Sequence, residues 1–128
     1  MQEGKSLNIF ILDDEEIILE MLGVYFTKEG FQCHAYEDPE LAVKDLLSGK
    51  PCDILVSDIF MDKYNGVEVA ELMRIHRPEI PVVLITGFVR FSGNDIPSNV
   101  SDIILKPFEL KNLKEKVLLA IEEFKSKL

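Results

Sequence analysis

The chain has 128 residues, of which 47% are hydrophobic and 29% are charged, and its formal net charge is −9. This length and composition fit one folded domain over residues 1–128 and exclude a largely disordered chain. The negative charge argues against a surface that binds nucleic acid or anionic lipid, and it favours a site for a divalent cation.

The sequence carries no sign of export or membrane insertion. Residues 1–6 are polar, and no apolar segment follows them that would make a signal peptide. No run approaches the roughly 18 apolar residues of a membrane span. The two cysteines, Cys33 and Cys52, lack CxxC spacing, so we interpret them as reduced thiols. We therefore expect a cytoplasmic protein that does not interact with membranes.

In the first part of the chain, short apolar runs alternate with helical patterns. Residues 7–12 predict a buried strand, and apolar residues then recur at helical spacing over residues 15–28. Residues 31–36 predict the second strand. A second helix is expected over residues 38–49, because Asp-Pro supplies an N-cap and a first helical residue and a glycine ends the pattern.

The middle of the chain repeats this alternation. The third strand is predicted over residues 54–58, where an apolar run without helical period ends on Asp58. A turn signal at Asn65–Gly66 leads to the third helix, over residues 67–76. The fourth strand is predicted over residues 81–86, and it again ends on a polar side chain.

The last part of the chain contains one segment that does not fit. A fifth strand is predicted over residues 102–105 and a final helix from residue 110 to the C-terminus. Residues 89–99 should form the fourth helix, but they are rich in Ser, Gly, Asn, Asp and Pro, which are poor in helix interiors. We expect this helix to be short, broken or mobile. The alternation as a whole predicts an α/β fold with a doubly wound sheet of five parallel strands.

Polar side chains stand where four of the predicted strands end. They are Asp13, Asp14, Asp58, Thr86 and Lys106. Taken singly, Asp14 would suit a helix N-cap, Thr86 a strand end and Lys106 the surface. The carboxyl ends of parallel strands meet at one edge of a sheet, however, so these side chains should converge. Close carboxylates repel one another, which favours a bound Mg²⁺.

This set of side chains suits phosphoryl transfer. A carboxylate can act as a nucleophile and become an aspartyl phosphate, and we assign that role to Asp58. The reaction needs mainly positioning and neutralisation of charge. A lysine and a hydroxyl near the phosphoryl oxygens, Lys106 and Thr86, would stabilise the charge that is added.

Four motifs in this order carry a resemblance to a known family. They are Ile11–Glu15, Asp53–Asp58, Leu84–Gly87 and Leu105–Phe108. With them the chain resembles the receiver domains of response regulators over residues 7–124. The resemblance implies a flavodoxin-like (βα)5 fold and a phosphoacceptor that takes phosphate from the phosphohistidine of a sensor histidine kinase or phosphotransfer protein. It also implies an output domain beyond residue 128 or a separate partner, and a dimer that could form on phosphorylation.

The resemblance also assigns roles to individual residues. Asp13, Asp14 and Asp58 would hold Mg²⁺, with help from the backbone carbonyl of Phe60. Thr86 would donate a hydrogen bond to the phosphoryl group and Lys106 would form an ion pair with it. The peptide bond between Lys106 and Pro107 is expected to be cis.

The chain departs from the family pattern at several positions. Asp62 stands where a proline is usual, which should loosen the loop and add negative charge near the metal. Ile103 replaces the usual aromatic residue three positions before the lysine, so we expect activation to act by ordering residues 88–99 instead. In the family, the positions of Phe60 and Phe88 flank the path of the hydrolytic water, so we expect these two rings to slow the loss of phosphate.

Two other interpretations compete with a phosphorylated switch. A receiver-like interaction module that works without phosphate is favoured by Ile103 and the irregular fourth helix, but the complete set of polar strand-end residues argues against it. An aspartate-nucleophile phosphatase usually needs a second Asp two residues after the nucleophile, where this chain has Phe60. No GxxxxGK or GxGxxG motif supports nucleotide binding. We do not expect a conventional enzyme.

Overall fold

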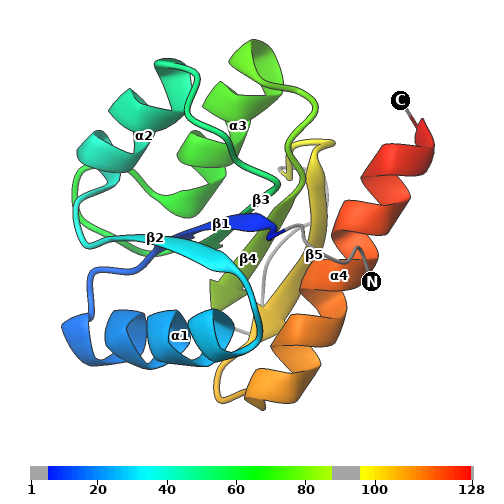
Figure 1. Ribbon diagram of the computed structural model, residues 1–128. Coiled ribbons are helices and arrows are strands. Elements are labelled where there is room, and N and C mark those ends of the chain that lie inside the picture. Colours follow the sequence, from blue (N-terminus) through cyan, green and yellow to red (C-terminus); the bar gives the residue numbers. More distant parts are fainter. Residues whose placement is uncertain (1–5, 88–95, 128) are drawn as a thin grey trace.

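Five parallel strands form one sheet in the computed structural model, which describes residues 6–87 and 96–127 (Figure 1). The strands are β1 (Asn8–Leu12), β2 (Gln32–Tyr36), β3 (Ile54–Asp58), β4 (Val82–Thr86) and β5 (Val100–Leu105). The helices are α1 (Glu16–Lys28), α2 (Pro39–Leu47), α3 (Gly66–His76) and α4 (Leu110–Lys127). The strand order is β2-β1-β3-β4-β5, and every neighbouring pair is parallel, so the predicted flavodoxin-like sheet is confirmed.

Helices cover both faces of this sheet, α1 and α4 on one side and α2 and α3 on the other (Figure 1). Successive residues of a strand point to opposite faces. In β1, Ile9 and Ile11 therefore join the core under α1 and α4, whereas Phe10 and Leu12 join the core under α2 and α3. Burial on both faces explains why the central strands read as continuous apolar runs.

The two helices on the second face begin at capped residues. Asp38 accepts a hydrogen bond from the Glu40 N–H, as the sequence predicts for an N-cap followed by proline. The Asn65–Gly66 pair, predicted as a turn, is instead the start of α3. Asn65 and Glu68 form a reciprocal capping box with two hydrogen bonds of 2.8 Å.

The connection between β4 and β5 lies only partly within the described residues. The predicted short fourth helix falls largely on residues 88–95, which are outside them, and residues 96–99 form a bend and a turn. β5 begins at Val100, two residues before its predicted start, and its register with β4 shifts between Val82 and Val83. None of the helices in the described ranges is both long and apolar enough to cross a membrane.

Candidate functional site

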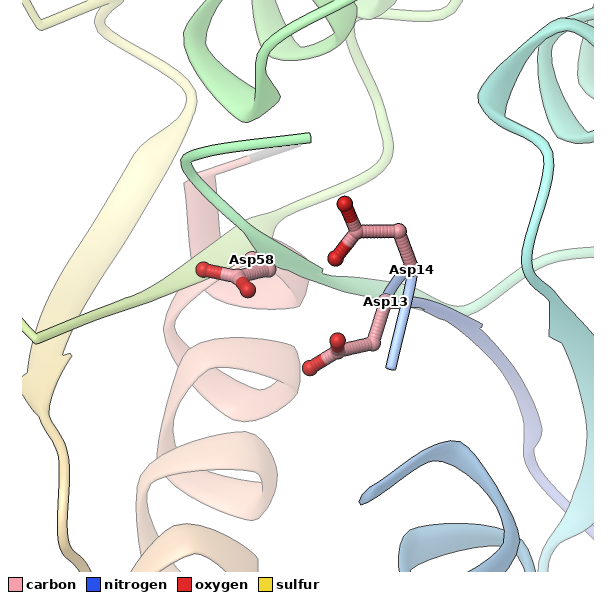
Figure 2. Close-up of side chains that lie close together, drawn as sticks. All are labelled: Asp13, Asp14 and Asp58. Carbon is pink, nitrogen blue, oxygen red and sulfur yellow. The ribbon is translucent and has the colours of Figure 1, made fainter. Parts of the chain in front are cut away.

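Three carboxylates meet at the carboxyl edge of the sheet (Figure 2). Asp13 and Asp14 directly follow β1, and Asp58 is the last residue of β3. The parallel register pairs Leu12 with Ser57, so the chain brings these acids side by side across the two central strands. One carboxylate oxygen from each of the three acids lies within 4.8 Å of the other two oxygens. No other such group of acids, histidines or cysteines occurs among the described residues.

The burial of these acids differs. The exposed fraction is 1% for Asp13 and 6% for Asp58, whereas Asp14 is exposed. Asp13 Oδ1 accepts the Glu15 N–H at 2.8 Å, but its buried Oδ2 has no hydrogen-bond partner among the described residues. Burial raises the pKa of Asp13 from 3.8 to about 6, opposed by the Glu15 hydrogen bond and increased by the nearby Asp58.

This donor set fits a hard divalent cation. Mg²⁺ prefers oxygen ligands and usually takes one or two carboxylates together with water and phosphate oxygens. Asp13, Asp14 and Asp58 supply such oxygens within 4.8 Å of one another, and the unsatisfied Oδ2 of Asp13 is an oxygen that a cation would satisfy. The same arrangement without a cation places like charges together at a cost.

Lys106, the first residue after β5, supplies the positive charge of the site. Its Nζ lies 3.1 Å from Asp58 Oδ2, 3.4 Å from Glu15 Oε1 and 3.8 Å from Asp13 Oδ2. Burial acts to lower the pKa of Lys106, but the hydrogen bond to Asp58 and the Asp13 carboxylate outweigh it, so the pKa is raised. The lysine therefore carries its charge at neutral pH.

Thr86 and Lys106 are held next to each other by the sheet. Thr86 ends β4 with its side chain buried, and its carbonyl accepts the Lys106 N–H at 2.8 Å. The predicted cis bond between Lys106 and Pro107 is confirmed. The structure thus brings Thr86, Lys106 and the three acids to one edge, as expected from their places at strand ends.

The loop after Asp58 is anchored at two places although it lacks the usual proline. Lys63 forms ion pairs with Asp38 at 3.2 Å and Glu40 at 3.1 Å, which join the loop to the start of α2. At the other end, the Gly66 N–H donates to the Ile59 carbonyl at 2.7 Å. Asp62 lies in this loop and is exposed.

Phe60 and Ile103 occupy two of the positions where the sequence departs from the family. The Phe60 side chain is 50% exposed beside the site, and it lines a surface hollow with Asp14 and Asp62. Phe88, the other expected shielding ring, lies outside the described residues. Ile103 is partly buried and packs against the hydrophobic core under α2 and α3.

Two residues that the sequence interpretation did not assign to the site contact it. Glu15 stands at the start of the predicted first helix, yet its carboxylate lies 3.4 Å from Lys106 Nζ. Gly66 packs directly on the backbone of Asp58, because a Cβ there would lie 2.5 Å from the Asp58 carbonyl oxygen. The Asn-x-x-Glu pattern could have revealed the helix start at Gly66, but no local signal indicates either contact.

The sequence matches the family model of the response regulator receiver domain over residues 9–118. The DNA-binding transcriptional regulator NtrC of Proteus hauseri is 30% identical over 112 residues, which cover 86% of this chain and 23% of that protein. The heme response regulator HssR of Staphylococcus epidermidis is 29% identical over 109 residues, which cover 84% of this chain and 48% of that protein. The chain thus spans less than half the length of either relative.

A solved structure agrees with these sequence matches. The response regulator protein TrrA of Thermotoga maritima, in complex with Mg(2+)-BeF, superposes with a TM-score of 0.80 at 29% identity. The superposition covers 89% of this chain and 98% of that one. The chain belongs to the response-regulator receiver domains, the signalling domains of two-component systems.

Proposed function

We propose that this domain is a phosphoacceptor switch that takes a phosphoryl group from a phosphohistidine onto Asp58. The donor would be a histidine kinase or a phosphotransfer protein. One observation carries the proposal. Asp58 stands at a strand end with the ammonium of Lys106 3.1 Å from its carboxylate and the carboxylates of Asp13 and Asp14 beside it. A nucleophile, a cationic side chain and a set of candidate metal ligands therefore lie together at one edge of the sheet.

The transfer exchanges one bond to phosphorus for another. A carboxylate oxygen of Asp58 attacks phosphorus and forms a new O–P bond. The N–P bond of the phosphohistidine breaks, and its electron pair stays on the imidazole nitrogen. The product is an acyl phosphate with added negative charge, which Lys106 would offset and to which the Thr86 hydroxyl would donate a hydrogen bond.

Mg²⁺ is the cofactor that the donor set supports. Asp13, Asp14 and Asp58 would hold it, together with the backbone carbonyl of Phe60. When bound, the ion would neutralise charge on the phosphoryl oxygens during transfer. The Mg(2+)-BeF complex of the similar TrrA protein supports this assignment.

The experiment is incubation with acetyl phosphate and Mg²⁺, followed by intact mass measurement. We expect the wild type to gain the mass of one phosphoryl group and Asp58→Asn to gain none. Asp62→Asn is the matched control, because it removes an exposed acid of the adjacent loop. Equal labelling of Asp58→Asn, or an unlabelled wild type, would contradict the proposal.

One observation supports the alternative, a receiver-like interaction module that works without phosphorylation. Ile103 packs against the hydrophobic core under α2 and α3, and the usual ring that would reorient on phosphorylation is absent from that position. An unlabelled wild type in the mass experiment would favour this alternative. The greater length of NtrC and HssR supports an output domain beyond residue 128, and a dimer that forms on phosphorylation stays a prediction.

Phe60 is expected to slow the loss of phosphate. Its ring is half-exposed two residues after Asp58, where it would screen the acyl phosphate from water. We predict that Phe60→Asn shortens the lifetime of the phosphorylated protein about three- to tenfold, which is about 1 kcal/mol in activation free energy. The decay of the phosphorylated mass after removal of acetyl phosphate measures this. Phe60→Leu keeps an apolar screen and should change the lifetime less; equal lifetimes for all three proteins would remove the shielding role.

A further inference from the structure

The ammonium of Lys106 is shared by three carboxylates, and one of them has no part in the proposed transfer. Asp58 is the phosphoacceptor and Asp13 a metal ligand, but Glu15 is neither. Glu15 Oε1 nevertheless lies 3.4 Å from Lys106 Nζ, closer than Asp13 Oδ2 at 3.8 Å. The pair joins residues that are 91 positions apart in sequence, at the tips of β1 and β5.

The backbone of Glu15 leaves its side chain available for this contact. Glu15 is the N-cap residue of α1, with extended φ and ψ of −94° and 110°, and its side chain makes no capping hydrogen bond. The backbone does the capping, since its N–H donates to Asp13 Oδ1 at 2.8 Å and its carbonyl accepts the Leu19 N–H at 3.0 Å. Loss of the carboxylate alone should therefore leave the start of the helix intact.

We infer that Glu15 is a positioning residue for Lys106 and that phosphorylation of Asp58 breaks the pair between them; this rests on the proposed function. Phosphorylation replaces the single negative charge of the Asp58 carboxylate with a phosphoryl group that carries up to two negative charges and three strong acceptor oxygens next to the lysine. The Glu15 side chain is 63% exposed, and exposed ion pairs are weak. The ammonium should therefore leave Glu15 for the phosphoryl oxygens.

Release of Glu15 would change the surface of α1 next to the phosphorylated Asp58. Ile17, two residues further along α1, is 83% exposed, and Met21 and Val24 on the same helix are 40% and 52% exposed. A protein donor must bring its phosphohistidine within bonding distance of Asp58, so it covers this neighbouring surface. The surface would then differ between resting and phosphorylated protein, which favours departure of the donor after transfer.

The test follows the Ile17 methyl signal by NMR in the whole chain, with beryllofluoride and Mg²⁺ as the phosphoryl mimic. In the wild type, the mimic should shift this signal. In Glu15→Ala, the signal of the resting protein should already lie most of the way to the mimic-bound position, so the further shift is small. Glu16→Ala is the matched control, because it removes the next acid along, in the first turn of the same helix, and it should keep the full response.

A double-mutant cycle separates positioning of Lys106 from a local effect of the substitution. Lys106→Met should displace the resting Ile17 signal as Glu15→Ala does, and adding Glu15→Ala to it should change little more. A full mimic response in Glu15→Ala, or the same reduced response in Glu16→Ala, would overturn the inference. A wild type whose Asp58 amide signal ignores the mimic would instead overturn the proposed phosphorylation, and this inference with it.

Discussion

Replacing Gly66 with alanine is expected to lower the free energy of unfolding by about 2–3 kcal/mol, the upper part of the range that overpacking usually costs. The new Cβ would lie 2.5 Å from the carbonyl oxygen of Asp58 and 3.1 Å from Cα of Ile59. Both neighbours are backbone atoms, so neither can rotate away. Relief requires α3 to move away from the end of β3, which also breaks the 2.7 Å hydrogen bond from Gly66 to Ile59.

A second glycine provides the matched control. Gly23 lies inside α1, and a Cβ there would meet nothing within 4 Å. Gly23→Ala should therefore stabilise the protein by about 0.5–1 kcal/mol, because alanine restricts the unfolded chain and favours helix. Urea denaturation of both variants measures the difference. Two Gly→Ala changes in helices should thus have opposite signs, and a Gly66→Ala variant as stable as the wild type would contradict the close contact.

The Gly66 substitution should also affect the chemistry. The clash falls on the carbonyl of Asp58 itself, so relief of the clash would displace Asp58 relative to Lys106 and the other acids. Misplacement of a reacting group lowers the rate even when the group is present. We therefore expect slower labelling of Gly66→Ala by acetyl phosphate under conditions in which the variant is folded, whereas Gly23→Ala should be labelled at the wild-type rate.

The sheet was predictable from the sequence because its central strands are buried on both faces. Runs such as residues 54–58 have no helical period and cannot be read as surface segments, so their boundaries agree closely with β3. The side chains of the site were predictable for a related reason. Residues at the carboxyl ends of parallel strands must share one edge, whatever their separation along the chain.

The start of β5 and the contacts within the site were not predictable in this way. Ser101 and Asp102 interrupt the apolar pattern, and the irregular register beside them leaves no clear period at the start of the strand. The pairing of Glu15 with Lys106 depends on how far two flexible side chains reach between elements. Gly66 was assigned to a turn because the reason for a glycine there, the Asp58 carbonyl, belongs to another element.

The other large effect concerns Asp13 in metal-free protein. Its pKa of about 6 in the folded state lies above the ordinary 3.8, chiefly because the group is buried. The folded protein therefore holds this proton more tightly than the unfolded chain does. The stabilisation that results is fully present below pH about 4 and is lost as the pH rises through about 6.

Asp13→Asn should abolish this loss. At pH 8 with EDTA, the variant is expected to be more stable than the wild type by about 3 kcal/mol, from a shift of about two pKa units. The advantage should shrink steadily between pH 6 and pH 4. Asparagine keeps an oxygen that can accept the Glu15 N–H, so the substitution removes the charge with little change of shape. Asp62→Asn controls for loss of net charge, and urea denaturation across this pH range gives the measurement.

Mg²⁺ should stabilise the wild type more than it stabilises Asp13→Asn. An ion that binds only the folded state stabilises it by about 1.4 kcal/mol at tenfold its dissociation constant, and the wild-type melting temperature should rise accordingly. Asp13→Asn, which lacks one of the three proposed ligands, should respond less. In the wild type the response should weaken below pH about 6, because the proton on Asp13 competes with the ion. A wild-type melting temperature that stays flat with millimolar Mg²⁺ would show that the acids repel one another without holding a cation.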